Sequence, residues 1–301
     1  MLAKPMHPSQ PTESHDMVRR MHAVDRQMFV REPLRFQGSI PVFSESNVYT
    51  ANYEQIADDH LVSLRETGSN PFIPERLWVQ TEASTVSLIK KHSKAGDRIL
   101  DVGVGLGRLL SHTPELKRYG MDISLAYLAV AQEKGIDVCY SLVEDMPYTE
   151  NCFDVVACTD VLEHVLDLNL ACRKILSVLQ PGGVLVVRVP YKEDLSEYTD
   201  GSCPYEYVHL RNFDEASLYL LFERVFKVEL CEMVKAGYGA SVSRLKCKID
   251  FRRFTRVLAA AHWVAGLLSQ TVRDSLVRTA CEPYEISVVV RKPVEARSFG
   301  D

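Results

Sequence analysis

The chain has 301 residues, a formal net charge of -5 at pH 7, 25% charged residues and 46% hydrophobic residues. These proportions are those of an ordinary soluble globular protein, and the length allows one large domain or one domain with appendages. A net negative charge does not attract a long nucleic acid to the whole surface, so we expect no bulk nucleic-acid binding.

The N-terminal residues contain no apolar run of signal-peptide length, and no stretch reaches the roughly 18–20 apolar residues of a membrane span. The eight cysteines contain no C-x-x-C pair. Without a secretion signal, reduced thiols are a better interpretation than disulfides or a zinc site. We therefore expect a cytoplasmic protein.

Residues 1–52 are predicted to form an N-terminal arm or lid, because prolines are frequent there and no regular pattern is present. Tyr49 and Tyr53 are expected to help cover a binding site. Apolar residues spaced by three or four positions then predict helices over 53–64 and 74–92.

From residue 98 onward, short apolar runs alternate with helical patterns. Strands are expected at 98–102, 118–123, 138–143, 153–159, 184–190, 226–233 and 284–291. Helices are expected at 124–135, 168–179 and 214–225. This alternation predicts parallel βαβ units with right-handed crossovers. The expected fold class is α/β, with a Rossmann-like, seven-stranded, mostly parallel sheet, helices on both faces, the N-terminal arm, and an insertion before the last strand.

The insertion, at about 235–282, reads as helical. Arg252, Arg253 and Arg256 precede an apolar stretch that contains Trp263. A buried helix is the simpler interpretation. The alternative is a helix in a membrane interface, with peripheral membrane contact through about 250–270.

The first strand ends in DVGVGLG, which places Asp101 before Gly103, Gly105 and Gly107. Glycines allow a tight turn and leave space for a ligand against the backbone. A dinucleotide fingerprint counted from Gly103 requires a glycine where this chain has Arg108. A carboxylate at the strand end repels a diphosphate and favours a cation or an ammonium group. S-adenosylmethionine offers both a sulfonium and an amino group.

The ends of the next two strands also carry acidic residues. Asp122 can accept hydrogen bonds from both hydroxyls of a ribose. Asp145 follows the third strand and can accept from an adenine amino group, while Ile123 and Met146 can flank the ring. The order and spacing of these residues predict a nucleoside site at one edge of the sheet.

Residues 97–191 resemble the core of class I S-adenosylmethionine-dependent methyltransferases. The similarity is greatest to the broad type 11 group, which includes ubiquinone- and menaquinone-pathway enzymes. The matching segments are ILDVGVGLGRLL, YGMDIS, VEDMPYTENCFDVVACTDVLEHV and VLQPGGVLVVRVP. Residues 53–301 are accordingly expected to form a methyltransferase domain. One departure is that Pro114 leaves the helix after the glycines short.

The resemblance implies a cofactor role for several strand-end residues. Asp101, Gly103 and Gly105 would contact the methionine part of S-adenosylmethionine. Thr159 and Asp160, at the fourth strand end, would lie near the methionine amino group and the transferring methyl.

The leading functional interpretation is O-methylation of a small molecule: a quinone precursor, a sugar, a natural product or a lipid-linked intermediate. His164 is the first candidate for a general base, because a neutral imidazole is available near pH 7. His209 is the second candidate for an active-site role. Glu163 and His164 could instead only orient the segment that follows.

Two alternatives use the same residues differently. Asp160, Glu163, His164 and His209 resemble the metal-binding pattern of some ubiquinone-pathway O-methyltransferases and small-RNA 2′-O-methyltransferases. Two carboxylates and two imidazoles suit a divalent ion, although the leading interpretation assigns no metal. The other alternative is a non-catalytic S-adenosylmethionine-binding protein. A nicotinamide oxidoreductase ranks below both, and the sequence leaves the oligomeric state open.

Overall fold

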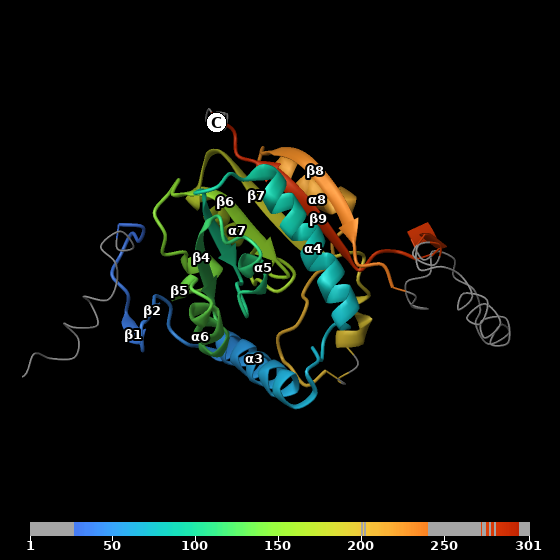
Figure 1. Ribbon diagram of the computed structural model, residues 1–301, viewed down its shortest axis with the longest axis horizontal. Coiled ribbons are helices and arrows are strands. Elements are labelled where there is room, and N and C mark those ends of the chain that lie inside the picture. Colours follow the sequence, from blue (N-terminus) through green and yellow to red (C-terminus); the bar gives the residue numbers. More distant parts are fainter. Residues whose placement is uncertain are drawn as a thin grey trace, which may run out of the picture.

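The computed structural model describes residues 27–199, 201, 203–239, 272, 275–276, 278–279 and 281–294 (Figure 1). The strands are β1 (Arg35–Gln37), β2 (Ile40–Val42), β3 (Arg98–Val102), β4 (Lys117–Asp122), β5 (Asp137–Tyr140), β6 (Phe153–Thr159), β7 (Leu179–Pro190), β8 (Glu229–Ala236) and β9 (Glu285–Arg291). The α-helices are α3 (Val48–Thr67), α4 (Glu75–His92), α5 (Arg108–Ser111), α6 (Leu125–Glu133), α7 (Leu168–Val178) and α8 (Glu215–Tyr219). The 3-10 helices η1 (Val143–Asp145) and η2 (Leu195–Tyr198) and the π-helix η3 (Leu220–Val225) complete the set.

The described strands form one sheet in the order β1-β2-β5-β4-β3-β6-β7-β9-β8. Strands β5, β4, β3, β6 and β7 are parallel, whereas β9 runs antiparallel to both β7 and β8. The predicted α/β class and the mostly parallel sheet are confirmed. The sheet has nine strands rather than seven because β1 and β2 join its β5 edge.

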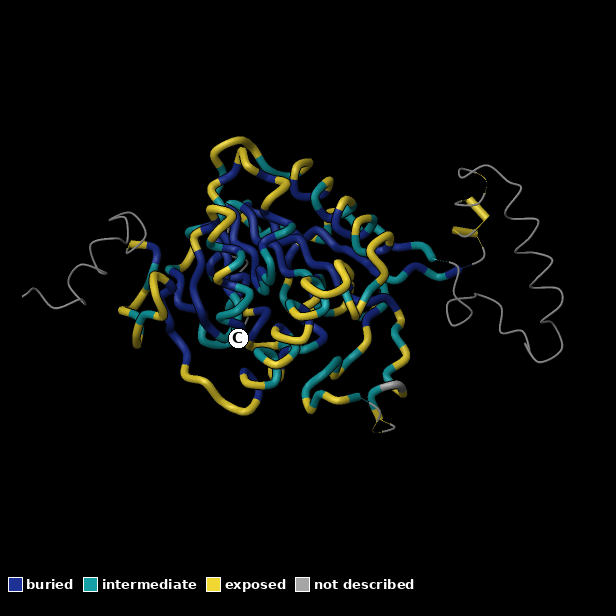
Figure 2. The backbone as a smooth tube through the Cα atoms, turned by 60° about the horizontal axis from the view of Figure 1, so that its bottom comes forward, coloured by how far each residue is buried: buried dark blue, intermediate teal, exposed yellow. Residues whose placement is uncertain are grey.

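The central strands are buried on both faces, as Figure 2 shows by the dark centre of the molecule. Alternation along β3 sends Leu100 to one core cluster and Ile99 to the other. Ile175 of α7 belongs to the cluster of Leu100, and Ile89 of α4 belongs to that of Ile99. The continuous apolar sequences of the central strands therefore reflect a sheet covered by helices on both sides.

The segment before α3 is part of the fold rather than only a cover. Residues 35–42 form a hairpin, and β2 is buried beside β5. Helix α3 begins at Val48, five residues earlier than predicted, because Asn47 and Thr50 form a reciprocal capping box. The predicted boundary between arm and domain at residue 52 therefore falls inside a helix.

Most of the predicted insertion at 235–282 lies outside the described residues, and so does the segment 250–270 with its predicted membrane contact. Its first residues, 235–236, belong to β8. Within the described part of the chain, no helix is both long enough and apolar enough to cross a membrane.

We expect Phe43→Ala to lower the free energy of unfolding by roughly 3–5 kcal/mol, the usual cost of emptying a buried phenylalanine site. Phe43 is 1% exposed, its ring centroid lies 4.6 Å from that of Phe29, and its N–H donates to Tyr140 O. Urea unfolding measures the change. Leu34→Ala is the matched control, because Leu34 is 55% exposed. Equal, small losses in both variants would mean that this segment is not part of the core.

Candidate active site

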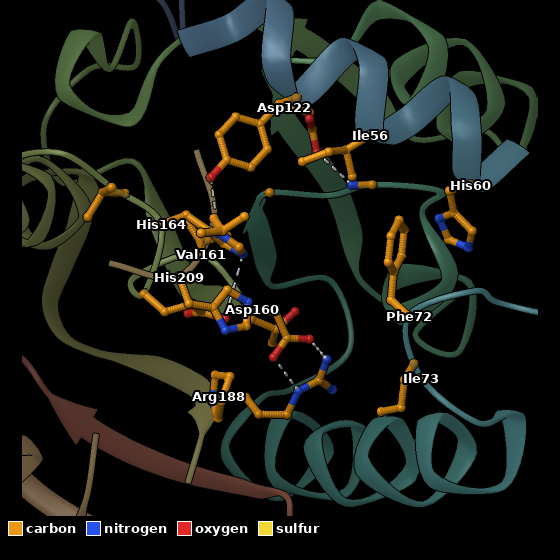
Figure 3. Close-up of a pocket in the computed structure, with 18 of the residues that line it drawn as sticks. Ile56, His60, Phe72, Ile73, Asp122, Asp160, Val161, His164, Arg188 and His209 are labelled. Carbon is orange, nitrogen blue, oxygen red and sulfur yellow. Dashed lines mark hydrogen bonds and ion pairs between the residues drawn. The ribbon is translucent and has the colours of Figure 1, made fainter. Parts of the chain in front are cut away.

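A cavity of about 1060 Å³ opens at the carboxyl ends of β3, β4 and β6 (Figure 3). Helix α3 passes over it, and residues 70–74 and 203–209 complete its rim. Open α/β sheets bind ligands at this edge, where the strand order reverses between β3 and β6. The cavity therefore occupies the position in which the sequence predicted a nucleoside site.

Asp101, the fourth residue of β3, places a carboxyl group at the floor of the cavity. It is 2% exposed, and its Oδ1 atom has no hydrogen-bond partner among the described residues. Burial raises the pKa of Asp101 well above its usual value, although the nearby Arg188 opposes the shift. A ligand that brings a positively charged donor to this oxygen would satisfy a group that the protein leaves unsatisfied.

The three glycines after Asp101 have different structural roles. Gly103 and Gly105 line the cavity, and a Cβ on Gly103 would collide with the Val161 side chain. Gly107 does not line the cavity: it precedes α5 with φ of 68°, and a Cβ there would lie 2.6 Å from Ile136 Cδ1. The cofactor role predicted for Gly107 is thus replaced by a packing role.

Asp122 ends β4 and faces the cavity, with Ile123 beside it. Its carboxylate accepts hydrogen bonds from the backbone N–H groups of Gly105 and Ile123, each at 2.8 Å, and of Ser124 at 3.0 Å. Burial outweighs these bonds and raises the pKa of Asp122 to about 6. The carboxylate is thereby fixed where it can accept from ribose hydroxyls.

The structure does not bring Asp145 and Met146 to the cavity. The Asp145 carboxylate lies 2.7 Å from Arg31, on the segment before α3, and Met146 is 4% exposed in the core. Leu142 and Val143 line the cavity instead. Glu144 of the short helix η1 also lines the cavity, whereas Asp145 and Met146, which follow it, do not.

Thr159 and Asp160 lie at the end of β6, where the sequence placed them. Asp160 has a positive φ of 56°, and its carboxylate is paired with the guanidinium of Arg188 on β7, with Nε 3.2 Å from Oδ1 (Figure 3). Arg188 also donates to Thr85 Oγ1 at 3.2 Å. The sequence analysis missed Arg188, although a single arginine within the apolar run VLVVRVP was a signal of a buried ion pair.

Glu163, His164 and His209 meet at the wall of the same cavity, with their ligating atoms within 4.8 Å of one another. Glu163 is fully buried, and neither of its carboxylate oxygens has a hydrogen-bond partner among the described residues. Nδ1 of His164 lies 3.0 Å from the Tyr53 hydroxyl, and Nδ1 of His209 is paired with Glu193. Each imidazole is therefore held through its Nδ1 atom, and Nε2 of His164 lies 3.9 Å from Oε1 of Glu163.

The surroundings of His164 favour the neutral form of its imidazole. Burial, with a smaller effect of the nearby His209, lowers the pKa of His164 to about 3. A base this weak takes up few protons at neutral pH, whereas a neutral imidazole nitrogen is a good metal ligand. The general-base role of His164 stays a prediction. Burial raises the pKa of Glu163, with Asp160 adding to the shift.

Helix α3 is hydrogen-bonded to residues 206–207, which lie beside it at the rim of the cavity. The Asn52 side chain donates to Tyr207 O at 2.8 Å and accepts from the N–H groups of Glu206 and Tyr207. Tyr49 and Tyr53 line the cavity, and the Tyr49 hydroxyl donates to His164 O. The covering position predicted for these two tyrosines is the one that the structure gives them.

Comparisons with known proteins agree with this geometry. A family model described as a methyltransferase domain matches residues 100–187. The ubiquinone biosynthesis O-methyltransferase of Pseudomonas putida GB-1 is 39% identical over 107 residues, 31% of this chain and 44% of that protein. An uncharacterized protein of Methanocaldococcus jannaschii is 35% identical over 109 residues, 36% of this chain and 48% of that protein. The chain thus matches less than half the length of these curated relatives.

Solved structures share the fold at low sequence identity. A Haloferax volcanii methyltransferase, in complex with the Trm112 methyltransferase activator, has a TM-score of 0.56 and 16% identity, over 83% of this chain and 100% of that one. A SAM-dependent methyltransferase of Thermotoga maritima has a TM-score of 0.50 and 16% identity, over 80% and 99%. The matched region is a class I S-adenosylmethionine-dependent methyltransferase domain. S-adenosylmethionine is its cofactor.

The affinity for S-adenosylhomocysteine should fall about tenfold between pH 7.5 and pH 5, because a group with a pKa of about 6 is mostly protonated at pH 5. Protonation of Asp122 removes an acceptor for a ribose hydroxyl, so binding is stronger above the pKa and weaker below it. Calorimetry across this range measures the effect. Asp122→Asn should bind weakly at every pH, and a pH dependence that persists in this variant would assign the effect to another group.

Two alanine substitutions separate the tasks of the glycines. Gly107→Ala should lower the free energy of unfolding by about 1–3 kcal/mol through strain and overpacking, while the folded variant keeps its affinity for S-adenosylhomocysteine. Gly103→Ala, which has the same positive-φ cost, should lose that affinity as well. Calorimetry and urea unfolding give the two readings. Equal affinities in the two variants would contradict the placement of the ligand over Gly103.

Proposed function

We propose that this protein transfers a methyl group from S-adenosylmethionine to a hydroxyl group of a small molecule, with the help of a divalent cation. The observation that carries the proposal is Glu163, a buried acidic group whose two carboxylate oxygens have no hydrogen-bond partner among the described residues and which lies beside the imidazoles of His164 and His209. It faces the same cavity as Asp101. Such a group costs free energy unless a positive charge satisfies it, which an acceptor hydroxyl alone does not supply.

The residues of the site suit an in-line displacement. Asp101 and Asp122 would hold the amino group and the ribose of the cofactor, which fixes its sulfonium beside the end of β6. The acceptor oxygen bonds to the methyl carbon as the carbon–sulfur bond breaks, and both electrons of that bond go to sulfur. Since sulfur is a good leaving group, alignment within the covered cavity supplies much of the catalysis, about 7–11 kcal/mol in well-oriented systems.

The donor set fits a divalent ion. Glu163, His164 and His209 provide one carboxylate and two imidazoles, and Glu193 and Tyr53 orient the rings as outer partners of metal ligands do. When bound, the ion would lower the pKa of an acceptor hydroxyl. The hydroxyl proton then leaves to water near neutral pH.

A small, uncharged acceptor suits the remaining lining of the cavity. Beyond the cofactor residues, the wall carries Tyr49, Tyr198 and Tyr207, whose rings can pack on an aromatic or apolar acceptor. Glu193 and Asp194 line the same part and would repel a phosphate. The name of the Pseudomonas relatives, which specifies O-methylation in ubiquinone biosynthesis, supports a hydroxyl acceptor such as a quinone precursor.

The purified protein should bind S-adenosylhomocysteine and not NADH in calorimetry, and should methylate members of a panel of phenols and catechols. A chelator should abolish turnover, and added Mg²⁺ or Mn²⁺ should restore it.

Glu163→Gln should lower kcat/KM by about a hundredfold or more, as expected for loss of a metal ligand, and keep the affinity for S-adenosylhomocysteine within about threefold. If neither the chelator nor Glu163→Gln changes turnover, the protein would be a methyltransferase that does not use a metal. Binding without turnover on any acceptor would favour a non-catalytic cofactor-binding protein.

A further inference from the structure

We propose that Arg188 keeps Asp160 out of the cation site, so that only Glu163, His164 and His209 hold the ion. The inference rests on the proposed function, because it concerns the same cation. It departs from the sequence pattern, in which Asp160 stands as a fourth ligand.

The pairing of Asp160 with Arg188 is built into neighbouring strands. Thr159 of β6 is in register with Arg188 of β7, and Asp160 N–H donates to Arg188 O at 2.9 Å. The guanidinium reaches the carboxylate through two nitrogens, an arrangement that fixes orientation as well as charge. Figure 3 shows both contacts between the two side chains.

Arg188 cannot easily release this carboxylate. Its side chain is 6% exposed, so its charge must be balanced inside the protein, and Thr85 accepts from its remaining terminal nitrogen. Breaking a buried pair leaves an uncompensated charge, which is strongly destabilising. The carboxylate oxygens of Glu163, by contrast, accept no hydrogen bond from the described part of the chain that would have to break before an ion binds. Although Asp160 and Glu163 both line the cavity, only Glu163 is available as a ligand.

A three-ligand set changes which ion the site should prefer. Two imidazoles and one carboxylate suit Mn²⁺, Co²⁺ and Zn²⁺ better than Mg²⁺, which favours oxygen ligands. Three protein ligands also leave coordination positions open toward the cavity, where oxygens of an acceptor can enter. Arg188 is thus a positioning residue, because it affects ion binding only by holding the Asp160 carboxylate away from the ion.

The test measures ion binding directly on the full chain. Mn²⁺ is titrated and its free form is followed by electron paramagnetic resonance, with Mg²⁺ added as competitor. The wild-type protein should prefer Mn²⁺ by roughly tenfold or more. The double variant Asp160→Asn with Arg188→Gln removes the pair without changing net charge, so its Mn²⁺ affinity should stay within about threefold of wild type. Glu163→Gln is the matched control and should lose about a hundredfold.

The outcomes separate this inference from the proposed function. A double variant that loses Mn²⁺ affinity as severely as Glu163→Gln would make Asp160 a ligand and overturn the inference, while the metal-assisted function would stand. A wild-type protein that binds neither ion would overturn both. Circular dichroism checks that the double variant is folded. If it is not, a crystal structure of wild type with Mn²⁺ decides: Asp160 on Arg188 supports the inference, and Asp160 on the ion contradicts it.

Discussion

Buried acidic groups without a hydrogen-bond partner among the described residues are the constraint on which this site depends. Asp101 and Glu163 line one cavity, and no described group donates a hydrogen bond to Oδ1 of Asp101 or to either carboxylate oxygen of Glu163. Burial raises the pKa of both groups, so the folded chain carries them at the expense of stability. Such an arrangement is retained where a cationic ligand completes it. In the proposed function, the amino group and sulfonium of the cofactor would supply positive charge at Asp101, and a divalent ion would supply it at Glu163.

The fold supplies the rigidity that this electrostatic arrangement needs. Parallel strands β3, β4 and β6 end side by side, which brings Asp101, Asp122 and Asp160 to one edge from distant parts of the sequence. Helix α3 then covers the edge and links its two halves. It contacts α6 through Glu54, residue 207 through Asn52, and His164 through Tyr53. In the proposed reaction, this one helix would lie against both the cofactor and the acceptor.

The sequence predicted the features that depend on local pattern. The central strands, the glycine turn and the strand-end positions of Asp101 and Asp122 follow from short segments, and the sheet class follows from their alternation. Features that depend on distant partners were missed. The hairpin at 35–42 is stable only because β5 offers it an edge, and Asp145 turns toward Arg31, more than a hundred residues away in sequence. The pair formed by Asp160 and Arg188 likewise exists only once β6 and β7 are in register.

We propose that the unsatisfied carboxyl of Asp101 selects a cationic sulfur ligand over a dinucleotide. Calorimetry of S-adenosylmethionine with the wild-type protein and with Asp101→Asn tests this selection, with thermal unfolding of the free proteins alongside. We expect the variant to lose most of its affinity while melting at the same temperature as wild type or higher, because a buried charge has been removed. Undiminished binding by the variant, or uptake of NAD by the wild-type protein in place of S-adenosylmethionine, would contradict this account.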